Sequence, residues 1–214
     1  MPWVIGILLL VAAYLLGAFP TGYLVARAAK GIDIREHGSG NTGATNVLRV
    51  VGKGAGLTVL VIDLLKGLSS VLLVRVILTV LYTEMPEQLA ILPWWITLAG
   101  LAAILGHSRS IWLNWTGGKS AATGLGVLLA LAWPVGLGAA GVFAIVLALF
   151  RIVSLSSIAA VLSAIVLVAV MQQPLPYILI AIAGGFYVIL RHRTNIQRLL
   201  EGTEPRLGSR SASS

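Results

Sequence analysis

Long apolar runs alternate with short polar segments along the first half of this chain. The apolar runs cover residues 3–26, 57–82 and 89–105. A helix needs about 20 mainly apolar residues to cross a bilayer. The pattern therefore predicts three membrane-spanning helices, with a kink in the first at Phe19-Pro20, because proline interrupts helical hydrogen bonding.

The second half of the chain shows the same alternation, with shorter apolar runs. They cover residues 121–133, 135–150, 155–171 and 175–190, with a turn expected at Pro134. The first two runs are short for a full span, which is acceptable where a helix end opens into a protein-lined site. The prediction is an all-α polytopic integral membrane protein with seven transmembrane helices, forming a single membrane domain over residues 1–214.

Charge is distributed unevenly between the two sides of this predicted bundle. Lysine and arginine gather in polar segments at about 30–56, 106–120 and 191–207, whereas the connection at 83–88 carries two glutamates and no basic residue. Basic loops stay in the cytoplasm. We therefore expect the N-terminus outside, the C-terminus inside and all three polar segments on the cytoplasmic face. The tail at 208–214 is expected to be disordered.

Composition supports a membrane protein and excludes several other classes. Of the 214 residues, 58% are hydrophobic and 10% charged, and the mean hydropathy is +0.97. Soluble domains carry about a quarter charged residues. The absence of cysteine excludes disulfides. The formal charge of +8 is explained by loop orientation and anionic partners, so no nucleic-acid partner is expected.

The polar segment at 38–49 (Gly-Ser-Gly-Asn-Thr-Gly-Ala-Thr-Asn-Val-Leu-Arg) has a composition that burial in lipid does not require. Glycines allow close backbone approach to a ligand, and N–H, hydroxyl, amide and guanidinium donors suit a phosphate. The alternative is a polar loop rich in turn residues, with Arg49 as a simple membrane anchor. The candidate phosphate-binding residues here are Gly38, Ser39, Gly40, Asn41, Gly43, Asn46 and Arg49.

Gly117-Gly118-Lys119 precedes a predicted helix and forms a second candidate anion site. Amides at a helix N-terminus and a lysine charge together favour phosphate. A nucleotide-binding P-loop is excluded because Leu113 stands where that motif needs glycine. The alternative interpretation is a hairpin turn with a flanking lysine.

A third polar motif, Arg191-His192-x-x-Asn195, follows the last apolar run, with Glu204 downstream. The spacing of three places His192 and Asn195 on one helical face, where both can touch one ligand. Histidine spacing fits no metal motif, so no metal site is predicted. Asp63 and Lys66 share the same spacing inside a predicted span, either as a functional pair or as charges that neutralise each other.

The ordered set of these segments, with Gly106-His107 preceding the second, resembles the three signature segments of the bacterial acyl-phosphate:glycerol-3-phosphate acyltransferase family, called PlsY. The resemblance implies transfer of a fatty acyl group from acyl phosphate to the 1-hydroxyl of sn-glycerol 3-phosphate, giving lysophosphatidic acid and phosphate. It further implies a multi-pass enzyme of the bacterial inner membrane, functional as a monomer among membrane lipids and without a cofactor.

Residue roles follow from the same resemblance. Gly117, Gly118 and Lys119 would form a phosphate-binding loop, and Glu204 would be structural. The sequence departs from the family pattern at Arg109-Ser110, where Phe-Pro is more usual, and at Ser120, where glycine is usual. The residues expected to take part in catalysis are Ser39, Arg49, Lys119, His192 and Asn195.

Two other function classes are compatible with a cationic membrane protein. A transporter of a phosphorylated metabolite would use the same anion sites, although the outer loops offer no matching one. A non-catalytic scaffold would bind anionic lipids through its net charge of +8. Turnover separates the enzyme from both.

Overall fold

The computed structural model describes residues 2–208, which form eleven α-helices and two short 3₁₀ helices. The predicted disorder of the tail therefore lies outside the described residues, apart from Gly208. The elements are α1 (Pro2–Ala18), α2 (Thr21–Lys30), η1 (Ile34–Glu36), α3 (Ala44–Val50), α4 (Lys53–Leu81), α5 (Pro86–Ala90), α6 (Leu92–Ser108), η2 (Ile111–Leu113), α7 (Ala121–Leu131), α8 (Trp133–Phe150), α9 (Val153–Val170), α10 (Leu175–Arg191) and α11 (Arg193–Leu200).

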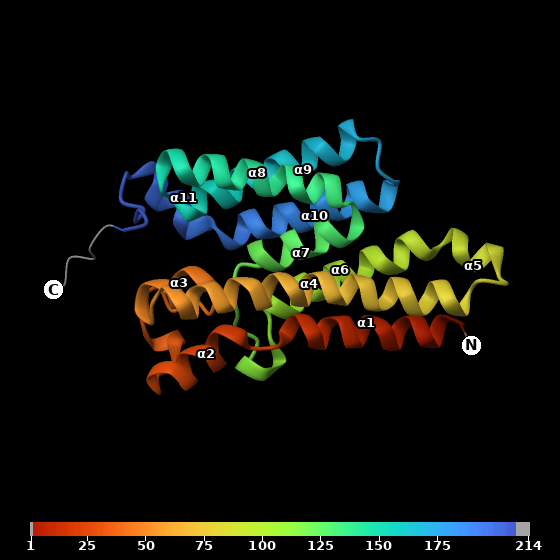
Figure 1. Cartoon of the computed structure of the whole chain (residues 1–214), viewed down its shortest axis with the longest axis horizontal. Helices are drawn as coiled ribbons and strands as arrows, with labels where there is room; N and C mark the ends of the chain where they lie inside the picture. The colour runs from red at the N-terminus through yellow and green to blue at the C-terminus, as the bar shows by residue number, and fades with distance from the viewer. Residues whose placement is uncertain (1, 209–214) are drawn as a thin grey trace.

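The long helices run side by side along the longest axis of the molecule (Figure 1). Helices α1, α4 and α6 pack together, α8 packs with α9 and α10 with α9, and α7 contacts both α4 and α8. The short helices α2, α3 and α11 lie at the end of the bundle opposite the N-terminus (Figure 1). The first and third polar segments of the sequence are thereby brought to the same end.

The prediction of an all-helical membrane protein is confirmed, because four helical stretches are long and apolar enough to cross a bilayer. They are Trp3–Lys30, which contains α1 and α2, and the helices α4, α8 and α9. Helices α10 and α11 pass the same test as a pair bent by 62°, whereas α6 and α7 are shorter apolar helices. The count of seven spans stays a prediction.

Helix boundaries differ from the predicted ones where proline and polar residues act locally. The first run breaks at Phe19-Pro20 as expected, and α2 then continues to Lys30. The turn expected at Pro134 occurs instead at Ala132, because proline is favoured in the first turn of a helix and Pro134 lies in the first turn of α8. The first polar segment is also partly helical, since it contains α3 and the start of α4.

Two glycines allow α7 to lie directly against α4. A Cβ atom at Gly67 would overlap the backbone oxygen of Thr123, and one at Gly126 would overlap that of Leu64. Small residues permit such close approach of helices in membranes. Since α7 begins just after Lys119 and Ser120, this packing fixes the second polar segment beside α4.

Candidate active site

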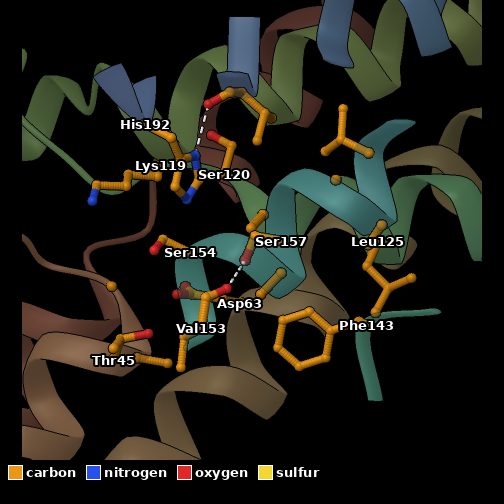
Figure 2. A pocket seen from close by; sticks show the side chains of 18 of the residues that line it. Thr45, Asp63, Lys119, Ser120, Leu125, Phe143, Val153, Ser154, Ser157 and His192 are labelled. Atoms are coloured by element: carbon orange, nitrogen blue, oxygen red, sulfur yellow. Dashed lines mark hydrogen bonds between the residues drawn. The ribbon is translucent and has the colours of Figure 1, made fainter. Parts of the chain in front are cut away.

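A cavity of about 340 Å³ lies between α4, α7, α8, α9 and α10, and residues of α3, α6 and α11 complete its lining. Its lining divides into a polar end and a longer apolar part. Figure 2 shows His192, Lys119 and Ser120 on one side of this pocket and Leu125 and Phe143 on the other. The cavity therefore offers one region suited to charged groups and another suited to a hydrocarbon chain.

The first polar segment is braced by one buried side chain, Asn46. Its amide oxygen accepts from the Ser39 N–H at 3.0 Å, and its amide nitrogen donates to the backbone oxygens of Asn41 at 2.9 Å and His37 at 3.0 Å. Gly38 has a φ of +60°, and a Cβ atom there would overlap the Asn46 amide oxygen. The loop therefore needs glycine at this position, and its folding leaves Ser39 on the cavity wall.

Arg49 joins the first polar segment to the third. It lies on α3 and lines the cavity. One guanidinium nitrogen donates to the backbone oxygen of Pro205 at 3.3 Å. Its remaining donors are available to an anion in the cavity, because a guanidinium presents five N–H groups in a fixed plane.

Glu204 is the centre of a buried network in the third segment. Its carboxylate accepts from the Ser154 hydroxyl at 2.7 Å, from the Asn195 amide at 2.6 Å and from the Arg198 guanidinium at 2.7 Å. The Asn195 amide oxygen in turn accepts from the Lys119 ammonium group. A chain of polar contacts thus runs from Glu204 through Asn195 to Lys119.

Lys119 places a half-buried positive charge on the cavity wall. Burial lowers its pKa to about 8, although Glu204 acts in the opposite direction. Desolvation disfavours the charged form of an amine. The ammonium group is therefore protonated in neutral solution yet only weakly hydrated, which strengthens its attraction for an anion.

The loop before Lys119 is fastened through its backbone. The Gly118 N–H donates to the backbone oxygen of His107 at 3.1 Å, so this amide is not free. Arg191 donates to the backbone oxygens of Gly117 at 3.3 Å and Gly118 at 3.2 Å. Neither glycine lines the cavity. Lys119 and the first residues of α7 are the part of this segment that faces it.

Ser120 explains one departure from the family pattern. Its φ is +61°, in the left-handed region that favours glycine. The Ser120 hydroxyl donates to the backbone oxygen of Ile104 at 2.7 Å and lies 2.6 Å from the Ser108 hydroxyl. These contacts offset the backbone strain and attach the loop to α6.

His192 lies between α10 and α11 and lines the cavity beside Lys119 (Figure 2). Its Nδ1 is 2.8 Å from the backbone oxygen of Val188. A carbonyl only accepts, so Nδ1 carries the proton and Nε2 keeps a lone pair. Burial lowers the pKa of His192 to about 4, so the ring is neutral in neutral solution.

The cavity lining contains most of the residues predicted from the sequence but not all of them. Gly38, Gly40, Gly117 and Gly118 do not face it. Sequence reasoning missed Ser154 and Ser157 on α9, although hydroxyl groups near the start of an otherwise apolar helix are a usable signal. Within residues 2–208, no group of three metal-ligating side chains is found. The predicted residues on the lining are Ser39, Asn41, Gly43, Asn46, Arg49, Lys119, His192, Asn195 and Glu204.

The sequence model of the family described as "Glycerol-3-phosphate acyltransferase" matches residues 7–202 of this chain. The match covers every helix that lines the cavity. The chain belongs to the glycerol-3-phosphate acyltransferase family. Membership confirms the resemblance drawn from the three polar segments.

Members of the glycerol-3-phosphate acyltransferase family from several bacteria are similar to this chain over nearly its whole length. The glycerol-3-phosphate acyltransferase of Trichormus variabilis is 57% identical over 205 residues, which are 94% of this chain and 91% of the relative. Glycerol-3-phosphate acyltransferase 2 of Rhizobium johnstonii is 58% identical over 213 residues, 96% and 97% of the two chains.

Crystal structures of a member of this family share the fold. The glycerol 3-phosphate form of PlsY (YgiH), an integral membrane glycerol 3-phosphate acyltransferase, matches with a TM-score of 0.85 and 39% identity. That comparison covers 95% of this chain and 96% of the other. The lysophosphatidic acid form matches with a TM-score of 0.82 and 38% identity.

Proposed function

We propose that this protein is a membrane acyltransferase that moves a fatty acyl group from acyl phosphate to the 1-hydroxyl of sn-glycerol 3-phosphate. The products are lysophosphatidic acid and phosphate. The observation that carries the proposal is the division of one cavity into a cationic polar end and an apolar remainder. Both substrates carry a phosphate, and one also carries a hydrocarbon chain. The names of the relatives support the acceptor, whereas the donor follows from the resemblance.

The polar end has donors for two phosphate groups. Lys119 and Arg49 supply positive charge, and Ser39 supplies a hydroxyl group. The N-terminus of α7 adds backbone N–H groups, because no side chain caps it. A preorganised donor that meets developing charge in the transition state contributes about 3–4 kcal/mol to lowering the barrier. We assign these residues to binding the phosphates and stabilising the leaving group.

The apolar part of the cavity is suited to the acyl chain of the donor. Its walls come from α4, α7, α8, α9 and α10, and include Leu60, Leu125 and Phe143. Burial of a hydrocarbon chain is favourable by about 0.8 kcal/mol per methylene group. A chain bound there places its acyl phosphate head at the polar end, next to the acceptor.

The reaction needs one bond to form and one to break. The acceptor hydroxyl oxygen attacks the acyl carbonyl carbon, the bond from that carbon to the phosphate oxygen breaks, and phosphate leaves with the bonding electrons. We propose that the leaving phosphate takes the hydroxyl proton. The lone pair on His192 Nε2 is the alternative acceptor, since this ring is neutral and lines the cavity.

A His192→Gln variant separates the two proton acceptors. Glutamine can still form hydrogen bonds but cannot act as a base near neutral pH. If phosphate takes the proton, we expect the variant to keep its pH dependence and to lose less than about 100-fold in kcat, which is below the range of about 100-fold to 10,000-fold typical of a general base. A larger loss of kcat at every pH with unchanged glycerol 3-phosphate binding would assign the role to His192.

The function itself is tested by measuring phosphate release from palmitoyl phosphate by the purified protein in detergent. We expect release that requires glycerol 3-phosphate, and none of the acyl product when palmitoyl-CoA replaces palmitoyl phosphate. Absence of turnover with uptake of labelled glycerol 3-phosphate into proteoliposomes would support a transporter instead. Absence of both activities would leave only a lipid-binding scaffold.

We also propose the finer topology: seven spans, the N-terminus outside, the C-terminus inside and the cavity open to the cytoplasm of a bacterial cell. The charge asymmetry supports it, because α5, which follows Glu84 and contains Glu87, lies at the end of the bundle opposite α2, α3 and α11 (Figure 1). We propose that the protein works as a monomer without a cofactor. The chain contains no cysteine, so single cysteines introduced into each loop report its side of the membrane by labelling.

A further inference from the structure

Three ionisable side chains are buried together beside the cavity without a part in the proposed chemistry. Asp63 and Lys66 on α4 form an ion pair of 2.9 Å, and their side chains are only 4% and 7% exposed. His107 at the end of α6 lies against them, with Nδ1 3.6 Å from the Asp63 carboxylate. Asp63 and His107 also line the cavity. The sequence prediction that Asp63 and Lys66 share a helical face is confirmed by this pair.

This cluster connects α4 to the break between α1 and α2. The Lys66 ammonium group donates to the backbone oxygen of Phe19 at 3.0 Å. That oxygen also accepts the Thr21 N–H at 2.9 Å, a contact of the chain break at Pro20 and not of a regular helix. Lys66 adds a charged donor to the same acceptor inside the bundle. The cluster thus has fixed positions on two sides, α4 and the chain break.

The third connection leads to the loop before Lys119. The His107 backbone oxygen accepts the Gly118 N–H at 3.1 Å, and the Ser108 hydroxyl donates to the Gly118 oxygen at 3.1 Å. The His107 ring packs on Gly118 so closely that a Cβ atom there would overlap Nε2. Moving His107 would therefore move Gly118, and with it the adjacent Lys119.

Stability alone does not account for charged groups at this position. Replacing a buried ion pair with apolar residues of similar volume is often neutral or stabilising, because desolvation offsets the attraction between the charges. Ionisable residues within membrane helices are expensive and tend to have a function. What the cluster adds is a directional contact that apolar side chains would not make.

We propose that Asp63, Lys66 and His107 are positioning residues that hold the loop of Gly118 and Lys119 at the correct distance from the phosphate region. Asp63 and His107 reach the cavity wall, but the role proposed for them is exerted through the loop and not on the reacting atoms. Asp63 and Lys66 set the place of the His107 ring, and the ring sets the place of the loop. This inference rests on the proposed function, since it assumes that Lys119 binds a substrate phosphate.

The test compares KM and kcat of four purified variants for each substrate. Lys119→Met identifies which substrate the loop binds. His107→Ala removes the ring, and we expect it to raise KM for that same substrate by about tenfold or more, because small displacements of positioning groups weaken binding and rate steeply. His107→Phe keeps a ring beside Gly118 but lacks the nitrogen that faces Asp63, so we expect it to recover only part of the loss. The double variant Asp63→Leu/Lys66→Met replaces the ion pair by apolar side chains, and we expect the same rise in KM with the thermal midpoint little changed.

Ser70→Ala is the matched control on the same helix. Ser70 is fully buried and donates to Lys66 and Ala13 backbone oxygens, but it does not reach the loop. We expect lower stability with unchanged KM. If His107→Ala does not fold, the double variant decides. The inference is overturned if Lys119→Met raises KM but the double variant, or His107→Ala, leaves it unchanged. If Lys119→Met itself leaves both KM values unchanged, the phosphate role of the loop fails as well.

Discussion

Replacing Lys119 with methionine is expected to lower kcat/KM by about 100-fold to 1,000-fold, the loss typical of a donor that meets charge in the transition state. Methionine keeps much of the side-chain volume and removes the charge. The cavity would then retain Arg49 but lose its weakly hydrated ammonium group, and Asn195 would lose its donor. Steady-state phosphate release with both substrates measures the effect.

Lys53→Met is the matched control, because Lys53 is exposed at the start of α4 and does not line the cavity. It removes the same charge from the protein, so its activity should equal that of the unmodified chain. Equal losses in the two variants would mean that net charge, and not the position of Lys119, governs the reaction.

The same residue predicts an alkaline limit to activity. Burial lowers the Lys119 pKa to about 8, so the side chain is charged below that pH and loses its proton above it. Activity should therefore decline as the pH rises through this value. Lys119→Arg keeps its charge throughout, because a guanidinium is not deprotonated in proteins. Its profile should stay flat over the same range, and a decline at the same pH would assign the limit to another group.

The second large effect is expected on folding. Glu204→Ala should destabilise the protein by about 2–6 kcal/mol, about 1–3 kcal/mol for each of the two buried donors left without an acceptor, whereas the Arg198 side chain is 37% exposed and regains water. The donors are Ser154, Asn195 and Arg198. Thermal midpoints and the yield of monodisperse protein in detergent measure the loss. Glu201→Ala is the control, since the exposed Glu201 carboxylate accepts a surface hydrogen bond from Gln197, and we expect its effect to stay within about 0.5 kcal/mol.

Glu204 also sets the expected response to acid. Burial acts to raise its pKa, but the hydrogen bonds from Asn195, Ser154 and Arg198 outweigh burial, so its pKa lies below the usual value of 4.5. A carboxylate with a lowered pKa stabilises the folded state above its unfolded pKa, and that stability is lost as the pH falls through the folded pKa. Glu204→Gln should remove this acid dependence. If the Glu204→Gln variant unfolds at the same acid pH as the unmodified protein, other carboxylates cause the acid transition.

Hydropathy and proline placement were enough to predict the helical fold and the break at Pro20. They misplaced the turn near Pro134, because a proline can follow the end of one helix or lie in the first turn of the next, as Pro134 does in α8. The helical content of the first polar segment was also missed. The short helix α3 buries Val47 against Ile34. The prediction for this segment rested only on its polar residues and so did not include the helix.

The three polar segments could be predicted to form a site, but the contacts between them could not. Asn195 joins Lys119 to Glu204 across 76 and 9 positions of the chain, and no local pattern encodes such pairs. The sequence predicted that backbone amides of the Gly117-Gly118-Lys119 turn would bind an anion. The Gly118 amide instead donates to the His107 carbonyl, a contact that the turn sequence alone does not reveal. Ser154 escaped notice because a serine in an apolar helix is as often bonded to its own backbone.

The network around Glu204 has a consequence for biosynthesis. Every helix that lines the cavity is synthesised before Glu204, whose carboxylate accepts the Asn195 amide that in turn contacts Lys119. A nascent chain already inserted in the bilayer therefore holds an unfinished pocket until its last polar segment leaves the ribosome. Assembly of the phosphate region therefore follows synthesis of the helices. A chain that stopped after α11 would insert in the membrane but lack the carboxylate that accepts the Asn195 amide.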